Sequence, residues 1–137
     1  MKKAFALYGK GDIGKTETLN LLIDLLTVAT VGGPMPTPAP KGHDRKRVFL
    51  IKELRIGVAT RGDNAYEVKE NCNFFESNTC DIVFTATRTW GGSCNEIEAY
   101  AKSKNAELKW EKKENILDLS KRASYNLQLA QKLFNMI

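Results

Sequence analysis

A glycine-rich segment between two apolar stretches constrains the fold of this chain more than any other feature. Residues 9–16 read GKGDIGKT, and they follow the apolar run from Ala4 to Tyr8. After this segment, apolar side chains recur at helical spacing, at Leu19, Leu22, Ile23 and Leu26. The pattern predicts a strand, a tight glycine turn and an amphipathic helix in immediate succession. A unit of this kind is typical of α/β proteins with a mostly parallel sheet.

The turn is predicted to bind a polyphosphate, because it fills every fixed position of the pattern G-x-x-x-x-G-K-[ST]. Its glycines let the backbone point several N–H groups inward at the positive end of the helix. Lys15 would reach the β- and γ-phosphates, and the hydroxyl of Thr16 would bind Mg²⁺. The alternative is a glycine turn that only caps the helix, with Lys15 solvated. The residues predicted to bind the cofactor are Gly9, Lys10, Gly11, Asp12, Ile13, Gly14, Lys15, Thr16 and Glu17.

Length and composition favour one domain over residues 1–137. The three cysteines are widely spaced, so neither a disulfide framework nor a C-x-x-C metal site is indicated. The sequence has no run of eighteen apolar residues and no signal-peptide pattern. We therefore expect a cytoplasmic protein that does not use a membrane as a partner.

The net charge of +5 favours acidic partners, and nucleic acid is one of them. The basic residues are dispersed, however, and acidic or apolar residues mostly separate them. This distribution is more typical of a solvated surface than of a dedicated nucleic-acid face. A nucleic-acid partner is supported only by the net charge.

Periodicity and turn residues predict the order of the elements along the chain. We expect a helix over 15–28, a long loop over 30–45 that contains all four prolines, and a hairpin of strands 47–51 and 54–60. A helix capped by Asn64 and Glu67 follows, and then a buried strand over 81–86. Ser93 and Glu96 form a second capping pair, ahead of a short strand over 106–110. The last helix would bury a stripe of Leu119, Ala123, Leu127, Ala130 and Phe134.

This alternation predicts a three-layer α/β fold: a mostly parallel sheet, with one antiparallel hairpin strand, between two layers of helices. In such sheets, ligands bind outside the carboxyl ends of the strands. The loops that meet this condition are 9–16, 61–64 and 87–93.

Two side chains in these loops are candidates for completing the site beside Lys15. Asp63 would lie near Mg²⁺ and hold either the metal or an attacking water, although it is equally suited to cap the next helix. Arg88 would neutralise charge on the transferred phosphoryl group, or else form a surface ion pair. We therefore predict Lys15, Asp63 and Arg88 as catalytic residues, and Thr16 and Asp63 as metal ligands.

Four other residues give weaker signals. Asp81 precedes its strand and therefore lies at the opposite edge of the sheet, which excludes it as a metal ligand. Trp90 would stack on a base, cover the pocket or simply pack. Lys112 and Asn115 follow the strand over 106–110, at a place where a base is often recognised.

With these motifs, the chain resembles the P-loop NTPases, most specifically over Gly9 to Thr16. The loop is also similar to the K-G-G-x-G-K-[ST] variant of the ParA, MinD and nitrogenase iron-protein group, although Asp12 stands where that pattern has glycine. This second similarity implies that Lys10 contacts phosphates, often across a homodimer. Residues 56–64 and 80–89 look like those of small bacterial P-loop proteins with no assigned reaction.

The first functional hypothesis is a protein that binds Mg-ATP and hydrolyses it slowly. ATP is favoured over GTP because the sequence has no guanine-reading N-K-x-D motif. The second hypothesis is a kinase that transfers the γ-phosphate to a nucleoside or another small hydroxyl compound. The loop over 30–45 is long enough for a lid, but the preceding helix should start it at the edge away from the phosphates. The third is a nucleotide-dependent switch that binds nucleic acid or a protein.

Overall fold

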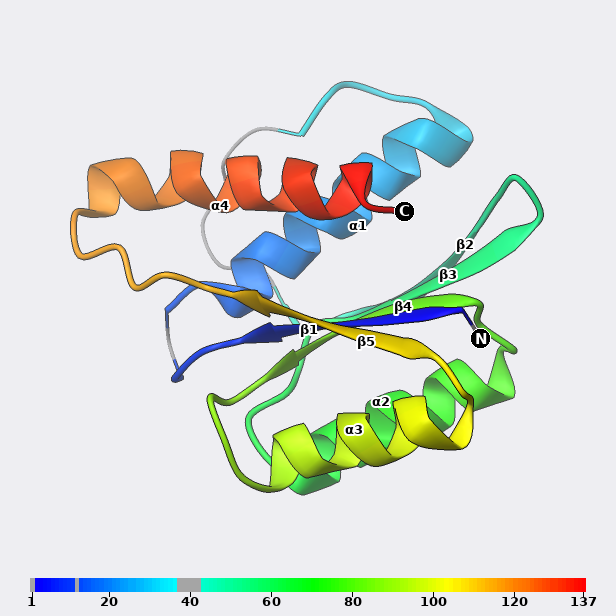
Figure 1. Cartoon of the computed structure of the whole chain (residues 1–137). Helices are drawn as coiled ribbons and strands as arrows, with labels where there is room; N and C mark the ends of the chain where they lie inside the picture. Colours follow the sequence, from blue (N-terminus) through cyan, green and yellow to red (C-terminus); the bar gives the residue numbers. More distant parts are fainter. Residues whose placement is uncertain (1, 12, 37–42) are drawn as a thin grey trace.

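The computed structural model describes residues 2–11, 13–36 and 43–137, and this part of the chain alternates strands with helices (Figure 1). The strands are β1 (Lys3–Tyr8), β2 (Lys46–Ile51), β3 (Leu54–Ala59), β4 (Ile82–Thr87) and β5 (Glu107–Lys112). The helices are α1 (Lys15–Val31), α2 (Ala65–Ser77), α3 (Gly92–Ser103) and α4 (Leu119–Asn135). The predicted loop residue Asp12, and residues 37–42 of the predicted loop over 30–45, lie outside the described residues.

The described strands form one mixed sheet in the order β2-β3-β4-β1-β5. Only β2 and β3 pair antiparallel, and the other neighbours are parallel. The strand β1 lies between β4 and β5, and its last residue, Tyr8, pairs with Thr87 of β4 and with Lys112 of β5. The loops that follow these three strands therefore leave the sheet at one edge. The predicted α/β class with one antiparallel strand is confirmed.

Helices cover both faces of the sheet: α1 and α4 lie on one face, and α2 and α3 lie on the other (Figure 1). Successive side chains of a strand point to opposite faces, so β1 contributes to two cores. Phe5 and Leu7 pack with α1 and α4, whereas Ala4 and Ala6 pack with α2 and α3. Burying a large apolar side chain contributes about 1.5–3 kcal/mol. Packing on both faces thereby fixes the position of the central strands. It also fixes the edge of the sheet from which the loops after β1, β4 and β5 leave.

The predicted hairpin is present, with strands that differ by one residue from the expected bounds. Its turn consists of Lys52 and Glu53, both of which have a positive φ, at 50° and 68°. Two central residues with positive φ give the turn whose twist matches that of the paired strands. Side chains other than Gly, Asn and Asp adopt this conformation at a cost, so the register of the hairpin rather than its turn sequence accounts for the geometry.

One of the two predicted helix caps is confirmed and the other is wrong. Asn64 precedes α2, and its side chain accepts a hydrogen bond from the backbone N–H of Glu67, as expected. Ser93 lies inside α3, which begins after Gly91, with no side-chain cap. The hydroxyl of Ser93 instead accepts a hydrogen bond from the backbone N–H of Arg88 at 3.0 Å. Ser93 thus fixes the loop before the helix rather than the helix itself.

The predicted helix ends differ in α1, and the predicted buried stripe differs in α4. The helix α1 continues to Val31 and stops at Gly32, whose φ is +85°. In α4, Leu119 is exposed, and the helix buries Asn126, Leu129, Ala130 and Leu133. Only Ala130 of the predicted stripe is fully buried. The prediction failed because it assigned only apolar side chains to the core, whereas the amide of Asn126 is buried among hydrogen-bonding groups of α1.

Candidate functional site

The candidate site lies where the connections of two neighbouring parallel strands diverge. The chain leaves β1 toward the α1 layer, whereas it leaves the adjacent strand β4 toward the α3 layer (Figure 1). Ligands of open α/β sheets bind outside the carboxyl ends of the strands, where such connections diverge. The glycine-rich loop after Tyr8 and the loop after Thr87 leave the sheet side by side, and Lys10 and Arg88 from these two loops line one crevice.

The glycines of the loop are needed for its close packing. Gly14 is the N-cap of α1 and has a φ of +99°, which L side chains rarely adopt. A Cβ on Gly14 would lie 3.1 Å from the amide of Asn126 and 3.2 Å from Cε of Lys113. A Cβ on Gly9 would lie 2.5 Å from Cδ1 of Ile13. The loop therefore has no room for side chains at these positions, as the pattern predicts.

Lys15 holds the loop together from inside. Its side chain is buried, and its ammonium group donates hydrogen bonds of 2.6 Å to the carbonyl oxygens of Gly9 and Thr87. Gly9 is the first residue of the loop, and Thr87 ends β4. The alternative of a solvated Lys15 is excluded, because the charge lies at the junction of the loop with β4.

Among the described residues, three backbone N–H groups of the loop have no protein acceptor. Within the described part of the chain, the backbone N–H groups of Gly11, Ile13 and Gly14 donate no hydrogen bond to a protein acceptor. Backbone N–H groups without protein partners at a helix N-terminus form a site for anions. Amides already bonded to protein acceptors would leave no donors for a phosphate, and among the described residues these three amides have no such acceptor.

Arg88 and Asp63, predicted from separate loops, lie together at the tip of the glycine-rich loop. Nε of Arg88 is 3.4 Å from Oδ1 of Asp63. The guanidinium group also lies against Gly11, since its nitrogens are 3.0 Å from the place of a Cβ on that residue. Lys10 is exposed and, with Asp63, Arg88 and Trp90, lines a hollow of about 420 Å³. The crevice therefore has cationic groups from two loops.

Thr16 has an acidic neighbour that the sequence analysis did not single out. Its hydroxyl donates a long hydrogen bond of 3.4 Å to Oδ1 of Asp44, which also accepts a bond of 2.9 Å from the hydroxyl of Thr60. Asp44 precedes β2, and the antiparallel register places the start of β2 beside the end of β3, with Lys46 opposite Ala59. A prediction that β2 pairs antiparallel with β3 would therefore have placed Asp44 near the end of β3. The end of the predicted loop over 30–45 thus returns to the first turn of α1.

The donor set around Thr16 fits a magnesium ion. Mg²⁺ prefers oxygen ligands and keeps several waters, so one hydroxyl and one or two carboxylates are sufficient beside phosphate oxygens. Thr16 and Asp44 provide such oxygens, whereas the carboxylate of Asp63 lies beside Arg88. Among the described residues there is no group of three or more His, Cys, Asp or Glu that would form a metal site of protein ligands alone.

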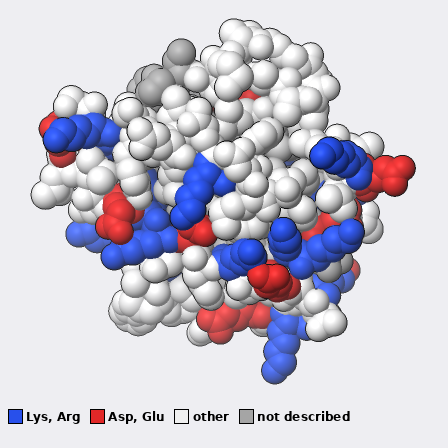
Figure 2. All heavy atoms as spheres, turned by 45° about the horizontal axis from the view of Figure 1, so that its top comes forward, with Lys and Arg blue, Asp and Glu red and all other residues white. Residues whose placement is uncertain are grey.

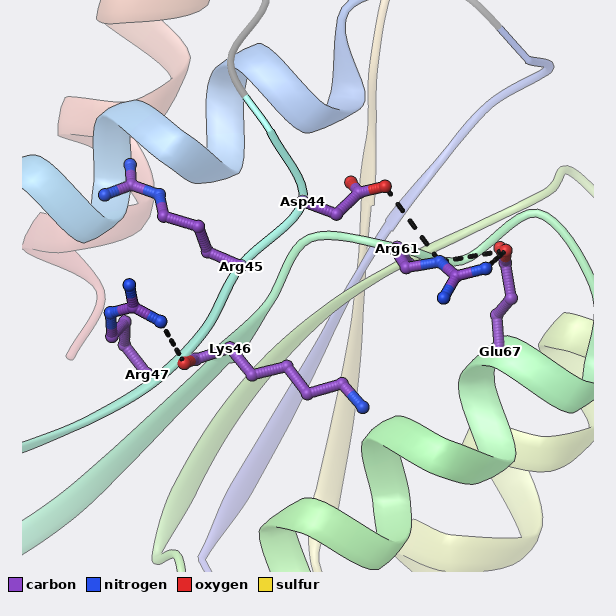
Figure 3. A pocket seen from close by; sticks show the side chains of 6 residues that line it. All are labelled: Asp44, Arg45, Lys46, Arg47, Arg61 and Glu67. Atoms are coloured by element: carbon purple, nitrogen blue, oxygen red, sulfur yellow. Dashed lines mark hydrogen bonds and ion pairs between the residues drawn. The ribbon is translucent and has the colours of Figure 1, made fainter.

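Beyond Asp44 lies a hollow of about 590 Å³ with arginine side chains around it (Figure 3). Its lining residues are Asp44, Arg45, Lys46, Arg47, Arg61 and Glu67. Arg61 contacts Glu67 and lies 3.9 Å from Asp44, as the dashed lines of Figure 3 indicate. Arg45 pairs with Asp24 at 3.1 Å. Carboxylates of the chain thus neutralise much of the positive charge of this hollow.

On the opposite side of the loop, a second buried lysine lies against Gly14. Lys113 is 2% exposed, its ammonium group donates to the carbonyl oxygen of Glu114 at 3.1 Å, and it lies 4.5 Å from the ring centre of Tyr125. Burial of the amine, and secondarily the charge of Arg122, lower the pKa of Lys113 to about 8. The sequence pattern had indicated the nearby Lys112 and Asn115 instead of Lys113. The predicted strand ended at residue 110, and β5 continues to residue 112.

The molecular surface gives no sign of a segregated basic face in the view of Figure 2. Lys and Arg side chains there lie among Asp and Glu side chains. No helix of the described residues is long and apolar enough to cross a membrane.

Comparisons with protein-family models, curated proteins and solved structures gave no match. A function for this chain must therefore be inferred from the geometry and chemistry of the site.

Proposed function

We propose that this chain is a P-loop protein that binds a nucleoside triphosphate, in the first place ATP, together with Mg²⁺, and hydrolyses it slowly. The observation that carries the proposal is the position of Lys15. Its buried ammonium group lies between a loop whose amides at Gly11, Ile13 and Gly14 have no acceptor among the described residues and the end of the neighbouring parallel strand. A polyphosphate is the ligand whose charge and shape suit such a loop.

The remaining residues suggest a division of roles around the phosphates. Lys15 and the loop amides neutralise the phosphate oxygens, and Lys10 adds a mobile positive charge at the rim. The hydroxyl of Thr16 and the carboxylate of Asp44 supply oxygen ligands on the magnesium side. Arg88, held by Asp63 against Gly11, is placed to stabilise charge that develops on the γ-phosphate. In this account Asp63 acts through Arg88 rather than as the metal ligand that we predicted from the sequence.

A second candidate function is transfer of the γ-phosphate to a small hydroxyl compound. The hollow beside Lys10 and Arg88 favours it, because a hydrolase needs space only for water whereas a kinase needs space for an acceptor. Residues 43–45 also return to the N-terminal half of α1, beside the phosphate loop, so the end of the long loop lies near the proposed site.

Product analysis with ATP and Mg²⁺ tests the proposal and separates the two reactions. We expect slow release of inorganic phosphate without any acceptor, which is lost when Mg²⁺ is chelated. Thr16→Ala and Arg88→Ala should each reduce the rate by about tenfold or more, because each removes a contact to the phosphates or their metal. The matched control is Lys69→Ala, which removes an exposed charge from α2 on the other side of the sheet.

Loss of ATP only when a nucleoside or another hydroxyl compound is present would favour the kinase. Release of phosphate at equal rates in the wild type and in both site variants would contradict the proposed site.

A further inference from the structure

A third hollow, of about 370 Å³, lies at the same edge of the sheet but on the face covered by α3. Aromatic side chains from three elements line it: Tyr8 at the end of β1, Trp110 in β5, and Trp90 in the loop between β4 and α3. Pockets for small ligands are typically hollows of about 300–1,000 Å³ with mostly aromatic and apolar walls. The size and the lining both suit one planar ring system.

The indole rings of Trp90 and Trp110 in this hollow are exposed to solvent. Tyr8 and Trp110 pack edge to face, with ring centres 6.1 Å apart. Trp110 remains 39% exposed and Trp90 is 83% exposed. Exposure of so much indole surface to water is unfavourable, and a flat ligand placed on these rings would remove it. Base rings stack on aromatic side chains in this way.

Two polar side chains of α3 complete the hollow. Asn95 and Glu98 line it and are exposed, and neither side chain has a hydrogen bond or an ion pair within the described part of the chain. A carboxylate accepts hydrogen bonds, whereas a carboxamide both donates and accepts. Together they match the edge of a nucleobase, which combines N–H donors with ring-nitrogen or carbonyl acceptors.

The hollow adjoins the one beside Lys10 and Arg88. Thr89, Trp90 and Gly91 line both this hollow and the one beside Lys10 and Arg88. A nucleoside with its base against the tryptophans would therefore direct its sugar toward these two cations. A monophosphate on that sugar would meet positive charge.

We propose that the hollow of Tyr8, Trp90 and Trp110 binds the base of a purine nucleoside or nucleoside monophosphate as a second ligand, beside the triphosphate. This inference rests on the proposed function, because a second ligand is defined by its position beside the triphosphate. It adds the chemical class of that second ligand. Purines are preferred because their larger ring offers more stacking surface than a pyrimidine ring does. The binding itself does not require the glycine-rich loop.

Intrinsic fluorescence tests this directly, since Trp90 and Trp110 are the only tryptophans in the sequence. Titration of the wild type with adenosine, guanosine and their monophosphates should quench the emission in a saturable manner. Uridine should bind more weakly, and ribose 5-phosphate, which lacks a base, should give no quenching. Stronger binding of the monophosphates than of the nucleosides would show that Lys10 and Arg88 also contribute.

Variants identify the site. Trp90→Ala should weaken purine binding by about tenfold or more, measured by calorimetry, because it removes a stacking surface. Trp90 is exposed, so its loss leaves the folded core intact. Glu98→Gln should shift the preference among bases, because it replaces a pure acceptor by an amide. Lys69→Ala again serves as the control.

Thr16→Ala separates this inference from the proposed function, since the Thr16 hydroxyl bonds to Asp44 rather than to Gly9 or Thr87. It should weaken Mg-ATP binding by about tenfold or more and leave purine nucleoside binding within about twofold of the wild type. The inference is wrong if no purine quenches the emission, if Trp90→Ala binds purines as tightly as the wild type, or if only ATP quenches and this effect disappears with Thr16→Ala.

Discussion

Asp44 and Asp63 are two carboxylates near one loop, and their neighbours give them different roles. Asp44 lies beside the hydroxyls of Thr16 and Thr60, whereas Asp63 lies beside the guanidinium group of Arg88. A carboxylate next to oxygen donors suits a hydrated cation. A carboxylate next to a guanidinium group holds that group in place. The same residue type is therefore expected to respond differently to the same substitution.

Asp44→Asn should remove most of the increase in ATP affinity that Mg²⁺ causes, while binding of metal-free ATP should change by less than about threefold. Asp63→Asn should preserve the increase caused by Mg²⁺ and reduce the rate of phosphate release, because Arg88 is no longer fixed. Calorimetric titrations of both variants, with Mg²⁺ and with chelator, provide the measurement. The reverse result, with the magnesium effect lost only in Asp63→Asn, would restore the assignment made from the sequence.

Lys113 links the pH to the stability of the folded chain. Its pKa of about 8 in the folded protein lies below the ordinary lysine value of 10.5, through burial and then the charge of Arg122. The carboxylates of Glu17 and Glu114 oppose this shift. Between these two values the unfolded chain binds more protons at this residue than the folded chain does. The free energy of unfolding should therefore rise as the pH increases from 8 toward 10.

The comparison with Lys113→Met isolates this contribution, since the other titrating groups are common to both proteins. Between pH 7 and 10 the stability of the wild type should increase relative to the variant, as urea unfolding at each pH would show. A difference between the two proteins that does not change with pH would mean that Lys113 titrates at its ordinary value.

At the scale of the elements, sequence patterns predicted the features that depend on neighbouring residues in the chain. They missed the features that depend on contacts between distant segments. The glycine turn, the cap at Asn64 and the central strand β4 follow from residues close together in the chain. The position of Asp44 and the buried amide of Asn126 depend on partners far away in sequence. Ser93 was assigned wrongly because its hydroxyl has two possible partners, and the nearby loop amide of Arg88 is the one it binds.

The hairpin between β2 and β3 provides a prediction at this scale. Glu53 has a φ of +68°, and glycine adopts that conformation without a steric penalty. Glu53→Gly should therefore stabilise the protein by about 0.5–1 kcal/mol. Glu70→Gly, inside α2, should destabilise it by a similar amount. Urea unfolding of both variants gives the comparison, and a loss of stability in Glu53→Gly would contradict the described turn.

For the whole molecule, the order of the strands is what brings the site together. The glycine-rich loop, the loop with Arg88 and the loop with Asp63 are separated in sequence, but they follow parallel strands that end at one edge. The alternation of strands and helices in the sequence was sufficient to predict that these loops lie at one edge of the sheet. It could not give the neighbours of β1, since no local pattern specifies which strands pair. That pairing decides which side chains lie beside Lys15.

The central claim is that this edge binds a triphosphate through Lys15, and an equilibrium titration tests it most directly. Calorimetry with ATP, ADP and GTP, each with and without Mg²⁺, should show tight binding of Mg-ATP to the wild type and to Lys69→Ala. Lys15→Ala should bind at least about tenfold more weakly, since a hydrogen bond to a charged group contributes about 1.5–3 kcal/mol. Thermal unfolding of the same samples establishes that the variant is folded. Equal affinity of folded Lys15→Ala and the wild type for Mg-ATP would contradict the account.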